Sequence, residues 1–198
     1  MSLQTSYRFI APFYDAFLAR ATAGSRQRSL SCLPQQGTSR VLLSGAGTGL
    51  DFPFLSSGHD YTALDLTSAM LIRSHSKVNK LKMEWVQGDS MALPFADQSF
   101  DYVVLHLIVA VVPHPERCLA EAARVLKPGG RILIFDKFLQ RGERAWLRRG
   151  LSVVAQVATR LNVVFEDVQD KISGLSLVSN EPALAGGWFR LIELLKRE

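Results

Sequence analysis

The stretch that decides the fold is VLLSGAGTGLD, residues 41–51. It is typical of a short buried strand that runs into a turn with glycine at every second position, Gly45, Gly47 and Gly49. Glycine lets the backbone turn tightly and brings its N–H donors close to a ligand, as at the sites where parallel sheets receive nucleotide cofactors. No carboxylate precedes the first glycine, because the strand ends in Leu42, Leu43 and Ser44. The stretch therefore predicts a cofactor site and leaves open how well it binds.

On both sides of this stretch, short apolar segments alternate with helical patterns. The segments are apolar almost throughout, which indicates strands buried on both faces and hence a parallel, doubly wound sheet with right-handed crossovers. We expect strands over 40–44, 60–64, 82–87, 100–106 and 131–136, and helices over 13–33, from about residue 50, over 67–77 and over 115–126.

The end of the chain shows two further strand patterns, 175–180 and 188–195, joined through EPALAGG. They predict an antiparallel hairpin at one edge of the sheet. The expected fold is therefore α/β and Rossmann-like, with seven mostly parallel strands and a C-terminal antiparallel hairpin. A chain of 198 residues suits one domain. We divide that domain into an N-terminal helical part (1–39), a core (40–136), and a basic helix with the edge hairpin (137–198).

Two carboxylates follow the next two expected strands. Asp65 ends the second strand, where a carboxylate can accept both hydroxyls of a ribose, and Asp89 follows the third, where it can accept from an adenine amino group. Taken singly, Asp65 could equally be a helix cap and Asp89 part of a turn. Together with the glycines they lie at the carboxyl ends of successive strands, where open α/β sheets bind ligands.

Composition limits the remaining possibilities. No apolar run is long enough to span a bilayer, the first residues lack the features of a signal peptide, and Cys32 and Cys118 form neither a disulfide framework nor a metal motif. We therefore expect a cytoplasmic protein without a metal.

The net charge of +5 is compatible with a plain solvated surface. The segment 141–160 has five arginines and one tryptophan beside an aliphatic face. This pattern suits either a core-packed helix or peripheral contact with the anionic inner face of a membrane, and not nucleic acid.

Four motifs occur in the order and spacing of one enzyme family: the glycine turn, YTALDLTSAML (61–71), VQGDSMALPFADQSFDYVV (86–104) and RVLKPGGRILIFD (124–136). Together they resemble the class I S-adenosylmethionine-dependent methyltransferases. Four parts of the chain are similar to the branch of ubiquinone/menaquinone methyltransferases and bacterial phosphatidylethanolamine N-methyltransferases. They are the run LPFADQSFD (93–101) in the third motif, RVLKPGG (124–130) in the fourth, the opening around Tyr7 to Asp15, and the ending GWFRLIELLKR. The resemblance is good over residues 7–136 and looser beyond.

The resemblance implies that S-adenosylmethionine is the cofactor and assigns it a set of residues. The glycine turn would pass under the methionine part, Asp65 would hold the ribose, and His106 would face the methionine and the substrate. The other implied contacts are Leu66, Asp89, Ser90 and Met91 around the adenine, Ala46 and Gly49 in the turn, and Tyr7 and Tyr14 in an N-terminal lid. Relatives usually carry an acid where this chain has Leu43. Asp51, just after the glycines, either compensates for that acid or caps the following helix.

Methyl transfer requires mainly alignment and exclusion of water, so the sequence leaves the acceptor open. His106 would take a proton from an amine acceptor or is simply a core histidine, and Tyr14 is the other candidate for substrate contact. We retain three hypotheses: a methyltransferase for a lipid amine or other amphiphile, a methyltransferase for a soluble thiol, phenol, amine or quinol, and a binding module that has lost catalysis.

Overall fold

A computed structural model describes residues 19–78, 80–138 and 163–198, and the fold is the predicted α/β fold. A seven-stranded sheet has the order β3-β2-β1-β4-β5-β7-β6. Strands β1 to β5 pair in parallel, and β7 pairs antiparallel with both β5 and β6. The strands are β1 (Arg40–Ser44), β2 (Asp60–Asp65), β3 (Lys82–Gln87), β4 (Phe100–His106), β5 (Leu126–Lys137), β6 (Leu175–Leu184) and β7 (Phe189–Lys196).

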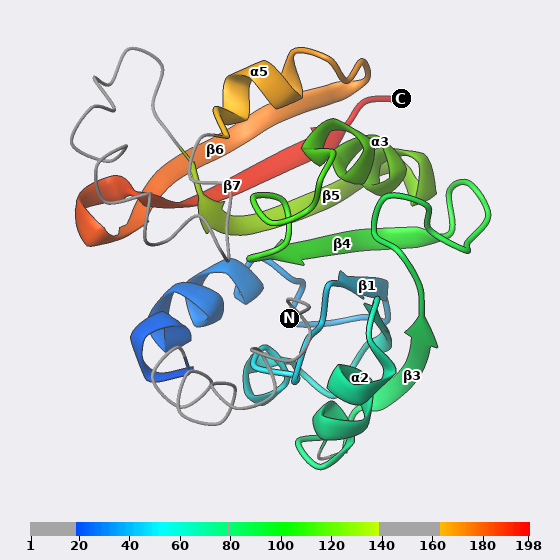
Figure 1. Cartoon of the computed structure of the whole chain (residues 1–198). Helices are drawn as coiled ribbons and strands as arrows, with labels where there is room; N and C mark the ends of the chain where they lie inside the picture. The colour runs from blue at the N-terminus through cyan, green and yellow to red at the C-terminus, as the bar shows by residue number, and fades with distance from the viewer. Residues whose placement is uncertain (1–18, 79, 139–162) are drawn as a thin grey trace, which may run out of the picture.

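Helices cover both faces of this sheet, as Figure 1 shows. α3 (Pro115–Val125) and α5 (Phe165–Gln169) lie on one side, and a helix over 19–30 lies on the other. α2 (Ser68–His75) connects β2 to β3. A 3-10 turn, η2 (Ala185–Gly187), joins the strands of the C-terminal hairpin.

The prediction of a helix from about residue 50 is wrong. Only the 3-10 turn η1 (Phe52–Phe54) forms there, and Leu55 is already extended. Pro53 is tolerated in the first turn, but the chain continues into Ser56 and the loop before β2 without adding a further turn. Because no α-helix forms here, Asp51 lies outside any regular helix, and its side chain takes part in the site described below.

Two apolar clusters, one on each face, explain why the strands are apolar almost throughout. Leu42, Val103 and Leu105 pack on the face that α3 and α5 cover. Leu43 and Val104, their neighbours in sequence, point to the opposite face. Successive residues of a strand alternate between faces, so covering both faces requires apolar residues at every position.

The parallel pairing brings the functional ends of the strands to one edge. Ser44 pairs with Leu64, and Asp65 pairs with Gln87, so the glycine turn, Asp65 and the loop to Asp89 follow neighbouring strand ends. His106 ends β4, which pairs with β1 along the edge of β1 opposite to β2. Within the described residues, no helix is long and apolar enough to cross a membrane. The basic segment 141–160 lies outside the described residues.

Candidate functional site

The glycine turn is shaped by three left-handed backbones. Gly45, Gly47 and Gly49 have φ of 79°, 54° and 76°, a region that disfavours other residues. A Cβ on Gly45 would lie 2.8 Å from Ile108, and one on Gly49 would lie 2.7 Å from the Phe52 ring. At Gly47 a Cβ would meet nothing within 4 Å. The two outer glycines therefore allow close packing within the protein, whereas the middle one faces open space where a ligand can approach.

Asp65 ties the glycine turn to the end of β2. Its Oδ2 accepts a hydrogen bond from the Gly47 N–H at 2.9 Å, and its Oδ1 accepts from the Thr67 N–H at 2.9 Å. The second bond is the capping interaction that the sequence allowed as an alternative role. Each carboxylate oxygen can accept more than one hydrogen bond, so these contacts leave acceptor capacity for ribose hydroxyls. Leu66, next to it, is 67% exposed, an unusual position for a large apolar side chain and one suited to covering a ring.

The loop after β3 is held by its own side chains. Asp89 Oδ1 accepts from the Met91 N–H at 2.8 Å, which is the turn arrangement that the sequence allowed. The Ser90 hydroxyl is buried and accepts a hydrogen bond from the Ser44 hydroxyl at 2.9 Å, so it links this loop to the end of β1. Met91 packs against the apolar core. The roles of these residues at an adenine remain predictions.

His106 is buried in a polar network that the sequence did not predict. Its Nδ1 donates to Oδ1 of Asp51 at 2.7 Å, and its Nε2 lies 2.9 Å from the Ser29 hydroxyl. The same Oδ1 accepts from Nη1 of Arg26 at 2.7 Å, and the Arg26 Nε donates to the Thr22 hydroxyl at 3.0 Å. The network joins helix 19–30, the segment after the glycine turn and the end of β4. Both ring nitrogens of His106 therefore have protein partners.

Asp51 does not cap the following helical turn, which was one of the two roles that the sequence left open for it, because its side chain makes no cap hydrogen bond to η1. Burial alone would raise the pKa of Asp51, but the neighbouring His106 and Arg26 hold it well below its usual value. Leu43, where the family resemblance predicts an acid, is buried in the apolar cluster on the same face of the sheet as His106. Sequence reasoning missed Arg26 and Ser29. Their spacing with Thr22 at i, i+4 and i+7 on one helix was the available signal.

A second buried carboxylate holds the loop after β4. Asp136, at the end of β5, is fully buried and accepts from the Ala110 N–H at 3.0 Å and the Lys137 N–H at 2.8 Å. Burial raises the pKa of Asp136 to about 6. The loop begins at Leu107, which has a left-handed backbone with φ 59°, and it places Ile108 against Gly45. The loop after β4 and the glycine turn are therefore in direct contact.

The described residues fit the expected cofactor. The open space at Gly47, the carboxylate of Asp65 and the exposed Leu66 follow two neighbouring strands at one sheet edge. Tyr7 and Tyr14 lie outside the described residues. Among the described residues, no group of three or more histidine, cysteine, aspartate or glutamate side chains is placed to hold a metal.

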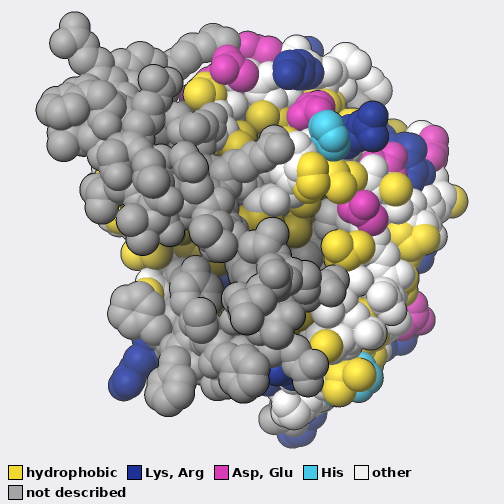
Figure 2. Space-filling model, viewed as in Figure 1, with side chains coloured by type: hydrophobic (Ala, Val, Ile, Leu, Met, Phe, Trp, Pro, Cys, Tyr) yellow, Lys and Arg dark blue, Asp and Glu magenta, His cyan; other side chains and the backbone are white. Residues whose placement is uncertain are grey.

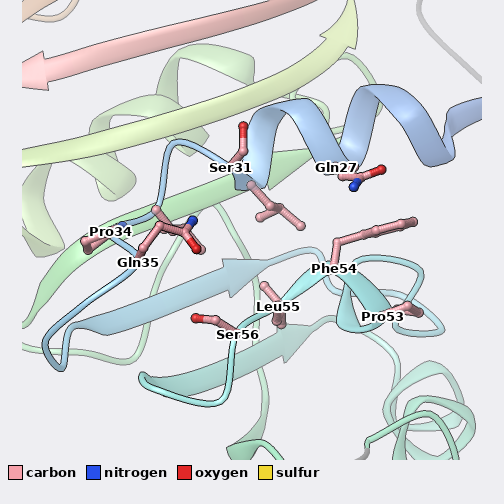
Figure 3. A pocket seen from close by; sticks show the side chains of 10 residues that line it. Gln27, Ser31, Pro34, Gln35, Pro53, Phe54, Leu55 and Ser56 are labelled. Carbon is pink, nitrogen blue, oxygen red and sulfur yellow. The ribbon is translucent and has the colours of Figure 1, made fainter.

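A pocket of about 340 Å³ lies elsewhere, between helix 19–30 and η1 (Figure 3). Phe54 and Leu55 face Gln27 across it, and Pro34 and Ser56 also line it. The segments carrying Pro34 and Ser56 lead into the amino ends of β1 and β2. The pocket is therefore not at the sheet edge that carries Asp65 and Asp89.

Comparisons with known proteins find methyltransferases. The family model described as "Methyltransferase domain" matches residues 42–134. The phosphatidylethanolamine N-methyltransferase of Cereibacter sphaeroides is 31% identical over 192 residues, covering 93% of both chains. A ubiquinone/menaquinone biosynthesis C-methyltransferase of Roseobacter denitrificans is 37% identical over 109 residues, covering 52% of this chain and 44% of that protein. This chain thus spans less than half of the quinone enzyme.

Solved structures share the fold. An S-adenosylmethionine-dependent methyltransferase from Thermotoga maritima superimposes with a TM-score of 0.72 at 20% identity, covering 99% of this chain and 100% of that chain. At such identity the likeness concerns the fold alone.

Proposed function

The chain belongs to the S-adenosylmethionine-dependent methyltransferases, and on this premise we propose that it methylates the amine of a phosphatidylethanolamine-like lipid. One observation carries the choice of acceptor. The similarity to a phosphatidylethanolamine N-methyltransferase extends over 93% of both chains, whereas the similarity to the quinone enzyme covers 52% of this one. Acceptor recognition depends on parts of the chain beyond the cofactor core, so a match over the whole length weighs more than a match over half of it.

The cofactor, S-adenosylmethionine, supplies a methyl group on a positively charged sulfur. The chain has to hold that group and align an acceptor with it. Gly47 would receive the methionine part, Asp65 the ribose hydroxyls and Leu66 the adenine, since these residues combine open space, acceptor capacity and exposure at one edge. His106 would lie on the acceptor side, at the end of β4.

Quinol methylation is the second candidate, favoured by the 37% identity to a ubiquinone/menaquinone C-methyltransferase over 109 residues. A soluble amine, thiol or phenol is the third. The three acceptor classes differ in the reacting atom and in whether they require a membrane surface, so one screen separates them.

Contact with a membrane belongs to the same proposal. It rests on the sequence of 141–160, with its arginines and Trp146, and that segment lies outside the described residues. On the described part of the face in Figure 2, charges of both signs are scattered among apolar side chains. The basic surface that anionic lipid requires would come from 141–160, where each arginine near the surface would add about 1 kcal/mol.

The test is methyl transfer from labelled S-adenosylmethionine to three acceptors: vesicles containing phosphatidylethanolamine, demethylmenaquinol in the same vesicles without that lipid, and a panel of soluble amines, thiols and phenols. We expect label in the phospholipid. Label in the quinol alone would replace the first candidate with the second, and label only in the soluble panel would select the third.

The membrane arm uses co-sedimentation with anionic vesicles at low and high salt. Changing Arg144, Arg148 and Arg149 to glutamine should release the protein into the supernatant, and changing the same residues to lysine should not. If the unmodified protein stays in the supernatant at low salt, contact with anionic lipid is wrong.

A further inference from the structure

The strongest unassigned feature is the buried network around His106. Asp51 is 5% exposed, Arg26 5%, Ser29 5% and His106 5%, yet each has a partner in the network. Burying charged groups is costly unless they are paired and hydrogen-bonded. A cluster of this kind lying between the glycine turn and the end of β4 calls for a role beyond filling the core.

The contacts determine which nitrogen of His106 carries the proton. A carboxylate only accepts hydrogen bonds, so the 2.7 Å contact with Asp51 requires a proton on Nδ1. Nε2 is then free to accept from the Ser29 hydroxyl, which lies 2.9 Å away. Arg26 donates to the same carboxylate oxygen and favours its ionised form. The order of groups, hydroxyl to imidazole to carboxylate, is that of a proton relay.

We propose that Asp51 is a positioning residue that holds His106 with Nε2 ready to accept a proton, and that the Ser29 hydroxyl passes the acceptor's proton to it. This inference rests on the proposed function, because a lipid ammonium must lose a proton before its nitrogen can react. The ammonium gives one proton to Ser29 Oγ while the Ser29 hydroxyl proton moves to Nε2 of His106. The nitrogen lone pair then bonds to the methyl carbon, and the electrons of the carbon–sulfur bond leave with the sulfur. The imidazolium is stabilised by Asp51 and later returns its proton to solvent.

The surroundings of His106 are consistent with this role. Phe135, from β5, packs its ring at 90° to the imidazole with centroids 5.8 Å apart, and Arg26 lies over the Phe135 ring at 6.0 Å. Among the described residues, the charged or titratable groups that face His106 are Asp51, from the segment after the glycine turn, and Arg26, from helix 19–30. β5 contributes an aromatic ring, and Ser29 a hydroxyl. The negative partner is therefore in direct contact with His106, and the positive one acts through it.

The first experiment measures the imidazole nitrogens directly and needs no acceptor. In the 15N-labelled full chain, with and without S-adenosylhomocysteine, long-range 1H–15N spectra report which nitrogen carries the proton, and His106→Gln assigns the signal. We expect a single form protonated on Nδ1. In the double variant Asp51→Asn with Arg26→Gln, which leaves no unpaired buried charge, we expect a mixture of both forms. A parent protein protonated on Nε2, or a double variant with an unchanged spectrum, would overturn the proposal.

The second experiment uses turnover with phosphatidylethanolamine vesicles. Ser29→Ala should lower kcat about 100-fold, the lower end of the usual effect of losing proton transfer, with unchanged affinity for S-adenosylhomocysteine. Ser31→Ala is the matched control, because Ser31 follows the same helix and its hydroxyl donates only to the Arg28 carbonyl at 2.7 Å. Asp51→Asn should move the acidic limb of log kcat/KM to lower pH, which a purely structural role would not do. Unchanged kcat in Ser29→Ala would overturn the relay.

The two failures are distinguishable. If the parent transfers no methyl group to phosphatidylethanolamine, the proposed acceptor is wrong, and the spectra still decide the arrangement of His106. If the parent is active and Ser29→Ala keeps full turnover, the acceptor stands and the relay falls.

Discussion

The carboxylate of Asp51 accepts a hydrogen bond from Nδ1 of His106 at 2.7 Å across 55 residues of sequence, in a place where both side chains are buried. Arg26 completes the contact at 2.7 Å from helix 19–30. The buried negative charge beside the glycine turn therefore comes from the segment after the glycines, while Leu43, in the strand before them, is part of an apolar cluster. This arrangement has consequences for stability that can be measured.

Asp51→Ala should lower the free energy of unfolding by about 3–5 kcal/mol, because it leaves the Arg26 charge buried without a partner. The double variant Asp51→Ala with Arg26→Met should recover a good part of this loss. Urea denaturation at pH 7 measures both. Asp60→Ala is the control, because the ion pair of Asp60 with Lys82 is largely exposed and contributes less than about 1 kcal/mol. A double variant as unstable as the single one would show that Arg26 is not the cause.

Asp136 should make stability depend on pH in the opposite sense to Asp51. Its pKa is raised to about 6 by burial, so the folded state holds its proton more tightly than the unfolded state, and the free energy of unfolding falls as pH rises from about 4 to 6. The fall amounts to about 3 kcal/mol for a shift of this size. The pKa of Asp51 is lowered, so its contribution is present above about pH 4 and is lost as pH falls further.

Asp136→Asn isolates this effect, because the amide has no charge at any of these pH values. We expect the stability of the variant relative to the parent to increase by about 2–3 kcal/mol between pH 4.5 and 7.5, whatever its offset from altered hydrogen bonds to Ala110 and Lys137. Urea denaturation at four pH values gives the comparison. A difference that is constant with pH would mean that Asp136 titrates normally in the folded protein.

Asp65→Ala should weaken binding of S-adenosylmethionine and S-adenosylhomocysteine by roughly 1–3 kcal/mol, the usual effect of removing a charged hydrogen-bond partner. Part of the loss would come from the Gly47 N–H, which Asp65 holds in place at 2.9 Å. Calorimetry measures the affinity, and Asp60→Ala, at the other end of β2, should bind like the parent. Unchanged affinity in Asp65→Ala would contradict the placement of the ribose.

The sequence predicted strands better than it predicted the polar network. The ranges 40–44, 82–87 and 100–106 agree with β1, β3 and β4, because each is a run of strand-forming residues between turn signals. The position of the glycines and carboxylates at one sheet edge could be predicted, since parallel strands end at one edge. The partnership of Arg26 and Ser29 with His106 could not, because it depends on how helix 19–30 packs across the sheet. The orientation of Asp51 depends on the absence of an α-helix after residue 50. Pro53 did not predict that absence, because proline is compatible with the first turn of a helix.

Gly47→Ala offers a test of where the cofactor lies, because Gly129→Ala is a closely matched control. Both glycines have a left-handed backbone, with φ of 54° and 75°, and a Cβ at either position would meet nothing within 4 Å. Each change should therefore cost about 1–2 kcal/mol of folding stability for the backbone alone. Only Gly47 lies in the turn beside Asp65, so only Gly47→Ala places a methyl group in the space that the cofactor needs. We expect a clear loss of affinity for S-adenosylhomocysteine in Gly47→Ala and none in Gly129→Ala, at similar melting temperatures. Equal affinities in the two variants would contradict the position of the cofactor at the glycine turn.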